Sequence, residues 1–408
     1  MIANIIYIFT VLKVTQWAWE AYLQWLNGRY YSDVDKQDSV MQTLDISEAE
    51  FKKAFEYTKA KDRFGFWSSI FDVSLLLIAL HLGFFTWWET FSVSVAPHSE
   101  LQQGLVFLMG LTLLGQLMQW PWDYYHTFCI EESFGFNKQT LGSWVLDQLK
   151  MFVVSFLLSI PILASVLWVM ASYPDSWWWM AAALLVGFMI LTSWLVPVFI
   201  SPLFNKFRPL EEGELQSGIS KLCTDVGFEA SEVSIMDASI RSSHGNAYFT
   251  GLFKSKKIVL FDTLVTSMSI SEILSVLAHE LGHFKCHHIK KRLGVSIVMI
   301  FAVFFGLWCL SQTPEFTESL GLSSTVFGVL FVSSLWWPLV QVFVTPLSSR
   351  SSRKHEFEAD EFAMRYTKDL GSALKKLSKH NHSMPLCHPL YSKVYHSHPP
   401  ILERLSAL

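Results

Sequence analysis

Residues 294–310 read GVSIVMIFAVFFGLWCL, a stretch that carries no charge and is apolar on every face of a helix. A core helix of a soluble protein keeps a polar stripe, so this stretch predicts a helix that lies in lipid. About 20 apolar residues are needed to cross the hydrocarbon core of a bilayer. Seven segments meet that length to within a few residues and are predicted membrane spans: 3–25, 66–88, 104–122, 151–172, 177–200, 293–311 and 325–345.

The first of these segments is less apolar than the others. Lys13 and Glu20 interrupt it, and ionisable groups inside a membrane usually face a protein interior or water. We therefore expect both side chains to face a water-filled interior. The alternative is that this segment lies partly in the membrane interface.

The composition excludes several classes of protein. Of the 408 residues, 51% are hydrophobic and 16% are charged, against about 25% charged residues in a typical globular chain. The formal net charge of −4 lacks the basic excess that nucleic-acid binding needs, so we expect no nucleic-acid partner. The five cysteines lie far apart without a C-x-x-C pair, which argues against a disulfide framework or a thiolate zinc site.

The connecting segments predict an orientation in the membrane. Three of them contain no Lys or Arg, namely 89–103, 173–176 and 312–324. They alternate with three that carry basic residues, which are 26–65, 123–150 and 201–292, and the tail 346–408 is also basic. By the positive-inside rule, the basic segments and the C-terminus are cytosolic and the N-terminus lies outside.

Residues 277–288 read LAHELGHFKCHH and contain the pattern H-E-x-x-H. On a helix, His279 and His283 lie one turn apart on the same face, within reach of one metal ion. Glu280 lies beside them, where it can take a proton from metal-bound water. Ser269 and Glu272 fit a capping box at the start of this helix, and we expect the basic run 290–292 to end it.

A third ligand is expected in SSRKHEFEADEFA, residues 351–363. Glu356 and Asp360 share one helical face, so Glu356 can complete a His-His-Glu site that leaves one position for water. Asp360 can accept a ring N–H from a liganding histidine and fix its orientation. Glu358 points off that face and is the second choice as ligand. His287 and His288 are expected to be solvated, because the site needs an open position.

Residues 244–252, HGNAYFTGL, combine Asn246 with residues that favour β-structure. An edge strand here could pair with an extended peptide, and Asn246 would then hold a substrate carbonyl. The alternative for Asn246 is an ordinary turn residue in front of a strand.

The chain resembles the type I CAAX prenyl proteases, the seven-span zinc endopeptidases of the gluzincin group. The resemblance rests on blocks in most of the chain: YYHTFCIEESFGFNKQT (124–140), ISPLFNKFRPL (200–210), SIRSSHGNAYFTGLFKSKKIVLFDTLV (239–265), LAHELGHFKCHH (277–288), SRKHEFEADEFA (352–363) and YHSHPPILERLSAL (395–408). It implies a mainly α fold, in which seven transmembrane helices enclose a chamber. A cytosolic gluzincin-like zinc protease domain with a small β-sheet caps this bundle.

The resemblance also assigns residues and substrate. It implies one Zn²⁺ per chain held by His279, His283 and Glu356, with Glu280 as general base. His398 would stabilise the oxyanion or contact the substrate, and Arg404 would support the substrate-binding site together with Asn246. The implied partners are the lipid bilayer and a prenylated CAAX protein or peptide, from which the family removes a C-terminal tripeptide.

The expected domain organisation follows from the spans and the two polar blocks. Residues 1–200 hold spans one to five with their cytosolic loops, and 201–292 form the first half of the protease domain with the edge strand and the H-E-x-x-H helix. Residues 293–345 hold spans six and seven. Residues 346–408 form the second half of the protease domain, with the third-ligand helix and the tail.

The sequence departs from the family pattern in places. Glu358 replaces the glutamine of the usual E-F-Q-A-D block, and the compact chain ends in ERLSAL without a dilysine retrieval signal. The compact chain and the missing signal favour a bacterial inner-membrane protein, or the endoplasmic reticulum membrane if the source is eukaryotic, whereas Glu358 adds an alternative carboxylate near the metal. Two alternatives stay open: a quality-control zinc peptidase that needs no prenyl group, and a transporter or scaffold with a structural zinc.

Overall fold

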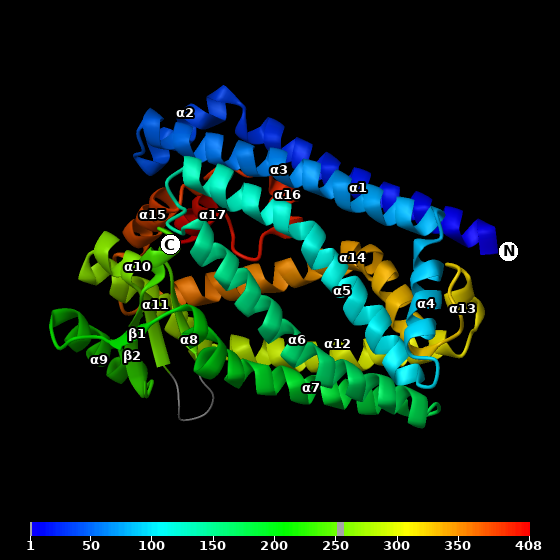
Figure 1. The fold of residues 1–408 in the computed structure, drawn as a ribbon. Helices are drawn as coiled ribbons and strands as arrows, with labels where there is room; N and C mark the ends of the chain where they lie inside the picture. The colour runs from blue at the N-terminus through cyan, green and yellow to red at the C-terminus, as the bar shows by residue number, and fades with distance from the viewer. Residues whose placement is uncertain (1, 251–256) are drawn as a thin grey trace.

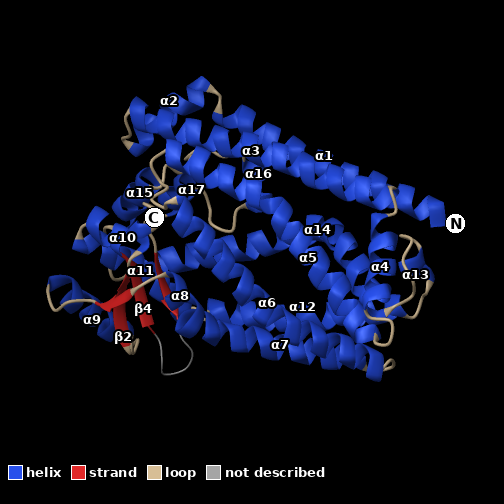
Figure 2. Ribbon diagram, viewed as in Figure 1, coloured by secondary structure: helices blue, strands red, loops and turns tan. Residues whose placement is uncertain are grey.

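The computed structural model describes residues 2–250 and 257–408, with side chains from residue 5 onward. Helices make up most of the molecule, and a small sheet lies at one end (Figure 2). The N-terminal helix α1 (Ile2–Tyr31) lies beside α3 along one edge (Figure 1). The helices α6, α7 and α12 form the opposite edge, with α5 and α14 between them.

Six helices in the described part of the chain are long and apolar enough to cross a membrane. Their bounds are α3 Glu48–His81, α5 Glu100–Tyr125, α6 Leu141–Ser172, α7 Trp177–Leu195, α12 His288–Ser311 and α14 Val326–Ala363. The predicted count of seven is therefore wrong by one, because α1 is not among them. Lys13, Gln16 and Glu20 make α1 too polar, and they hydrogen-bond to one another along it.

The predicted span 66–88 does not form one helix. The helix α3 ends at His81, and the chain turns at Gly83, whose φ of +70° suits a residue without a Cβ. The short helix α4 (Phe84–Val95) then packs against α5. The apolar run of the sequence continues through this turn, which is why hydropathy alone misplaced the end of the span.

The helices α12 and α14 each run between the polar end and the membrane part without a loop. The helix α14 runs unbroken through Pro338 and Pro346 to Ala363, so the predicted seventh span and the third-ligand helix are one element. The H-E-x-x-H helix α11 (Ile270–Lys285) ends earlier than expected. His287 adopts φ 59°, and the basic run 290–292 belongs to α12 instead.

Within the described residues, the sheet has four strands in the order β1-β2-β4-β3. Their bounds are β1 Phe207–Pro209, β2 Glu232–Met236, β3 Ala247–Thr250 and β4 Lys257–Phe261. The central pair β2 and β4 is parallel, and β1 and β3 flank it in antiparallel pairing. The strand β3 takes up residues 247–250 of the predicted segment 244–252 and is thus an edge strand, while residues 251 and 252 lie outside the described part of the chain.

The remaining helices connect or cover these parts. They are α2 Val34–Leu44, α8 Ser201–Phe204, α9 Glu214–Val226, α10 Asp262–Ser267, α13 Glu315–Glu318, α15 Leu370–His380, α16 Pro389–Tyr395 and α17 Ile401–Ala407. The π-helical turns η1 (His126–Glu131) and η2 (Val196–Ile200) prolong α5 and α7, and η3 (Ala238–Ile240) is a 3₁₀ turn.

The interior divides into separate apolar clusters. The largest lies between the sheet, α9 and α11, and includes Ile258, Leu260 and Leu277, each fully buried. Among the spans, a cavity of about 570 Å³ is lined by mainly apolar side chains of α5, α6, α7, α12 and α14. The polar end therefore has a core of its own, which holds α11 in place for the site described below.

Candidate metal centre

A capping box begins the helix α11, as the sequence predicts. The Ser269 hydroxyl accepts a hydrogen bond from the Glu272 amide, and the Glu272 carboxylate accepts one from the Ser269 amide. Ile273, Leu277 and Leu281 are buried in the cluster beneath the sheet. This packing fixes the rotation of α11 about its axis.

Gly282, inside the H-E-x-x-H segment, lets α11 approach α14 closely. A Cβ added at Gly282 would lie 3.0 Å from both the Cα and the carbonyl oxygen of Ala359, and 3.2 Å from the Cβ of Phe362. Backbone atoms do not yield as a flexible side chain does. The short interhelical distance brings the histidines of α11 next to the carboxylates of α14.

His279, His283 and Glu356 lie together between the two helices. Their potential ligand atoms are all within 4.8 Å of one another. His279 Nε2 lies 3.4 Å from Glu356 Oε2, His283 Nε2 lies 3.2 Å from Glu356 Oε1, and the two Nε2 atoms are 3.3 Å apart. Three donor atoms converge on one point, as a metal ion requires.

The surroundings of Glu356 give a second reason, besides the short distances, to expect a divalent metal here. The Glu356 side chain is 1% exposed, and its Oε2 lies 2.7 Å from His398 Nδ1 and 3.4 Å from His279 Nε2 without a hydrogen bond of acceptable geometry to either. A buried carboxylate oxygen costs free energy unless a cation or a well-directed donor completes it. Two imidazole nitrogens and one carboxylate are the set that zinc takes in hydrolytic sites.

Asp360 and Arg404 hold the first histidine. His279 Nδ1 lies 2.7 Å from Asp360 Oδ1, and Arg404 donates two hydrogen bonds to the same carboxylate at 2.6 and 2.8 Å. Burial by itself lowers the pKa of His279, but hydrogen bonds with Asp360 and Glu356 outweigh it and raise this pKa to about 9. Without a metal, His279 therefore carries a proton between two carboxylates.

His398 from the C-terminal tail also reaches the cluster. Its Nδ1 lies 2.7 Å from Glu356 Oε2, while its side chain stays 68% exposed. The His398 ring thus contacts the carboxylate of Glu356, the third predicted ligand, and stays open to an incoming molecule.

Glu280 is half-buried beside the two histidines. Within the part of the chain that the structure describes, its carboxylate makes no hydrogen bond or ion pair, so it is available to exchange protons. Asn246 lies directly before β3, and its Oδ1 accepts a hydrogen bond from the Ala247 amide. The strand β3 packs against α11.

Two residues named in the sequence analysis, His288 and Glu358, make contacts that it did not predict. His288 is not solvated as expected, because its side chain is 1% exposed and hydrogen-bonds to His283 at 3.0 Å. Glu358 does not join the cluster of ligands but accepts from His288 Nε2 at 2.8 Å. The spacing of five residues between His283 and His288 did not predict this contact, because on one continuous helix the two side chains would point in different directions.

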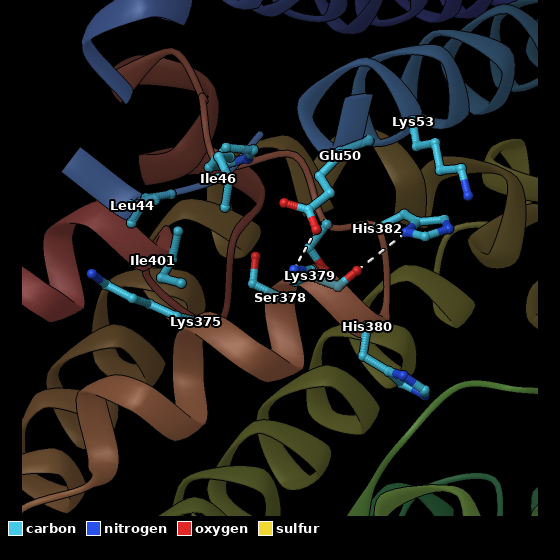
Figure 3. A pocket seen from close by; sticks show the side chains of 13 residues that line it. Leu44, Ile46, Glu50, Lys53, Lys375, Ser378, Lys379, His380, His382 and Ile401 are labelled. Atoms are coloured by element: carbon cyan, nitrogen blue, oxygen red, sulfur yellow. Dashed lines mark hydrogen bonds and ion pairs between the residues drawn. The ribbon is translucent and has the colours of Figure 1, made fainter. Parts of the chain in front are cut away.

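A separate cavity of about 300 Å³ lies where α3 begins, against α15 (Figure 3). Lys53, Lys375 and Lys379 make its lining basic, and Lys379 pairs with Glu50 across it. The same end of α15 fastens the segment before Asn246, because Asn381 accepts a hydrogen bond from the Gly245 amide at 3.1 Å. This cavity contains none of the clustered histidines and carboxylates.

Comparison with known proteins shows the family to which the chain belongs. Residues 29–206 match a family model described as the CAAX prenyl protease N-terminal domain with five membrane helices, and residues 209–408 match peptidase family M48. The chain is 35% identical to CAAX prenyl protease 1 of Saccharomyces cerevisiae, over 98% of this chain and 94% of that protein. It is 33% identical to the human CAAX prenyl protease 1 homolog, over 97% of this chain and 93% of the relative.

A solved structure is similar throughout. The crystal structure of S. mikatae Ste24p superimposes with a TM-score of 0.90 at 34% identity, covering 99% of this chain and 98% of the other. These matches to peptidases do not fit the alternative of a transporter or scaffold with a structural zinc. The chain belongs to peptidase family M48, with the CAAX prenyl protease type of N-terminal membrane domain, and is a multi-pass membrane metalloendopeptidase.

Proposed function

We propose that this protein hydrolyses peptide bonds with one zinc ion held by His279, His283 and Glu356. The observation that carries the proposal is the convergence of these three side chains between α11 and α14, where His279 and Glu356 are buried and His283 is partly buried. Asp360, with Arg404 behind it, orients His279. The donor set leaves room for a fourth ligand, which distinguishes hydrolytic from structural zinc sites.

The residues around the cluster have different roles in the proposed reaction. Bound zinc polarises a scissile carbonyl and lowers the pKa of a coordinated water towards about 7. Glu280 takes the proton of the attacking water and delivers it to the leaving amine. His398 donates a hydrogen bond to the oxygen that becomes negative, where loss of one donor costs roughly 10²–10³ in rate.

Asn246 and β3 are proposed to hold the peptide. As one of the two edge strands of the sheet, β3 has one side free of a neighbouring strand among the described residues. An extended substrate can add there by main-chain hydrogen bonds, which fixes its direction across the zinc site. The Asn246 amide would then hold a substrate carbonyl.

The proposed substrate is a prenylated CAAX protein, from which a C-terminal tripeptide is removed. The names of the yeast and human relatives support this substrate. The test compares hydrolysis of a farnesylated C-a-a-X peptide with its unprenylated twin by purified, zinc-loaded protein in detergent. Cleavage confined to the farnesylated peptide is expected. Equal cleavage of both would instead assign a general membrane-protein peptidase.

We also propose an orientation in the membrane and a division of the chain into domains. The basic connecting segments support a cytosolic C-terminus and an external N-terminus. The membrane part would be 1–200 and 293–345, with the protease domain assembled from 201–292 and 346–408. The two predicted membranes, bacterial inner membrane and endoplasmic reticulum, are distinguished by fractionation of the source cells.

A further inference from the structure

We infer that His288 is a positioning residue that fixes the second metal ligand, His283, through a hydrogen-bonded chain ending at Glu358. The inference rests on the proposed role of His283 as a zinc ligand. His288 has no place among the converging ligand atoms, yet its side chain is 1% exposed and directly contacts His283.

The hydrogen bonds specify the tautomers of both rings. His283 Nε2 faces Glu356 and His279, so a metal at that point takes its lone pair and leaves the proton on Nδ1. That Nδ1–H lies 3.0 Å from His288 Nδ1, which must therefore accept. The proton of His288 is then on Nε2, where it is donated to Glu358 Oε2 at 2.8 Å. Each donor in the chain meets an acceptor.

The backbone and the neighbouring ring hold His288 in this place. His287 adopts a left-handed conformation, with φ 59°, between the end of α11 and the start of α12. This kink turns His288 back towards α11 instead of leaving it on the outer face. The His355 ring then stacks on His288, with ring centroids 4.1 Å apart and an angle of 15° between the planes.

The two predicted histidine ligands thus have different partners. His279 is held by the carboxylate of Asp360, whereas His283 is held by an imidazole that a carboxylate backs. A neutral imidazole acceptor orients the ligand ring while adding no charge next to the metal. Glu358 occupies the position where the related block usually has glutamine, whose amide oxygen can also accept from His288 Nε2. The chain of hydrogen bonds therefore does not depend on the charge at position 358.

The experiment measures zinc affinity of the full-length protein in detergent by competition with a chelator. It also records the absorption spectrum of the Co²⁺-loaded protein, which reports ligand geometry. His288→Phe keeps a ring that can stack on His355 but removes the acceptor, and Glu358→Leu removes the end of the chain. We expect zinc affinity to fall about 10- to 100-fold in both, with a changed Co²⁺ spectrum.

Two variants serve as controls. Glu358→Gln keeps an acceptor and should retain zinc affinity within about threefold of wild type. His287→Asn removes an exposed histidine, and asparagine tolerates the left-handed backbone, so it should also behave as wild type. If His288→Phe does not fold, the contrast between Glu358→Leu and Glu358→Gln carries the test alone.

The outcomes separate this inference from the proposed function. Wild-type protein that binds no zinc would remove the proposed function itself. Wild-type protein that binds zinc, with unchanged affinity and Co²⁺ spectrum in folded His288→Phe and Glu358→Leu, would overturn the positioning role of His288 and leave the proposed function standing.

Discussion

His279 carries a proton that a metal ion must displace. Burial opposes that proton, but Asp360 and Glu356 raise the pKa of His279 from 6.5 to about 9. Because the pKa is raised, the metal-free ring is protonated below about pH 9, and metal binding releases this proton. The competing proton therefore weakens metal binding as pH falls.

The expected result is a zinc affinity that keeps rising between about pH 7 and about pH 8.5, by roughly tenfold per pH unit. An ordinary histidine, with a pKa near 6.5, would give a nearly flat profile in that range. Chelator competition at several pH values, at constant ionic strength, measures the slope. A flat profile would contradict the proton held between Asp360 and Glu356.

Arg404 neutralises a buried carboxylate next to a predicted ligand. It donates two hydrogen bonds to Asp360, whose side chain is 3% exposed. Arg404→Ala leaves that charge without its partner, so we expect zinc affinity to fall about 10- to 100-fold. Lysine should not restore it, because it lacks the two-pronged geometry of the guanidinium. A raised KM with unchanged zinc affinity would instead place Arg404 at the substrate, as the sequence suggested.

At the scale of elements, the spacing of α11 and α14 depends on Gly282. A methyl group there meets the Ala359 backbone at 3.0 Å, so Gly282→Ala must push the helices apart. We expect a loss of about 1–3 kcal/mol in stability and weaker zinc binding. Gly294→Ala in α12 is the matched control, since no atom lies within 4 Å of its added Cβ. Equal thermal unfolding and zinc affinity in the two variants would refute the role given to Gly282.

The elements also show where sequence patterns were sufficient. The capping box of Ser269 and Glu272 and the one-turn spacing of His279 and His283 are local, and the structure has both. The place of Glu356 followed from the same helical periodicity. His288 could not be predicted, because its position depends on the left-handed turn at His287 and on stacking with His355 from another helix. Hydropathy likewise did not reveal the turn at Gly83 that ends α3.

At the scale of the whole molecule, the proposed orientation places the metal centre in the cytosol. His98 lies in a segment without Lys or Arg, Lys368 lies in the basic tail, and both are exposed. Single-cysteine variants at these positions, in a cysteine-free background, should differ in labelling by a membrane-impermeant maleimide. In sealed spheroplasts that carry the protein in a bacterial inner membrane, cysteine at position 98 should react from the outside and cysteine at position 368 only after permeabilisation. In sealed endoplasmic reticulum vesicles, whose outer face is cytosolic, the two cysteines should exchange these roles. The opposite pattern in either membrane would invert the orientation.

The membrane architecture was largely predictable because long apolar helices are a strong signal. The exceptions are α1, whose Lys13 and Glu20 lower its hydropathy, and the predicted span 66–88, which is broken at Gly83. Neither polar block of the sequence, taken alone, predicts how the metal centre assembles. It arises because α14 extends without interruption from the apolar segment to Glu356 and Asp360, and so delivers both carboxylates to α11.

The most direct measurement compares peptide hydrolysis and zinc content in wild type and Glu280→Gln, both purified in detergent. If Glu280 is the general base, the variant should bind one zinc ion per chain as wild type does and lose hydrolysis by at least about 10³-fold. Arg350→Gln, on an exposed side chain of α14, controls for handling and should keep full activity. A zinc-loaded Glu280→Gln protein that cleaves as fast as wild type would contradict the account.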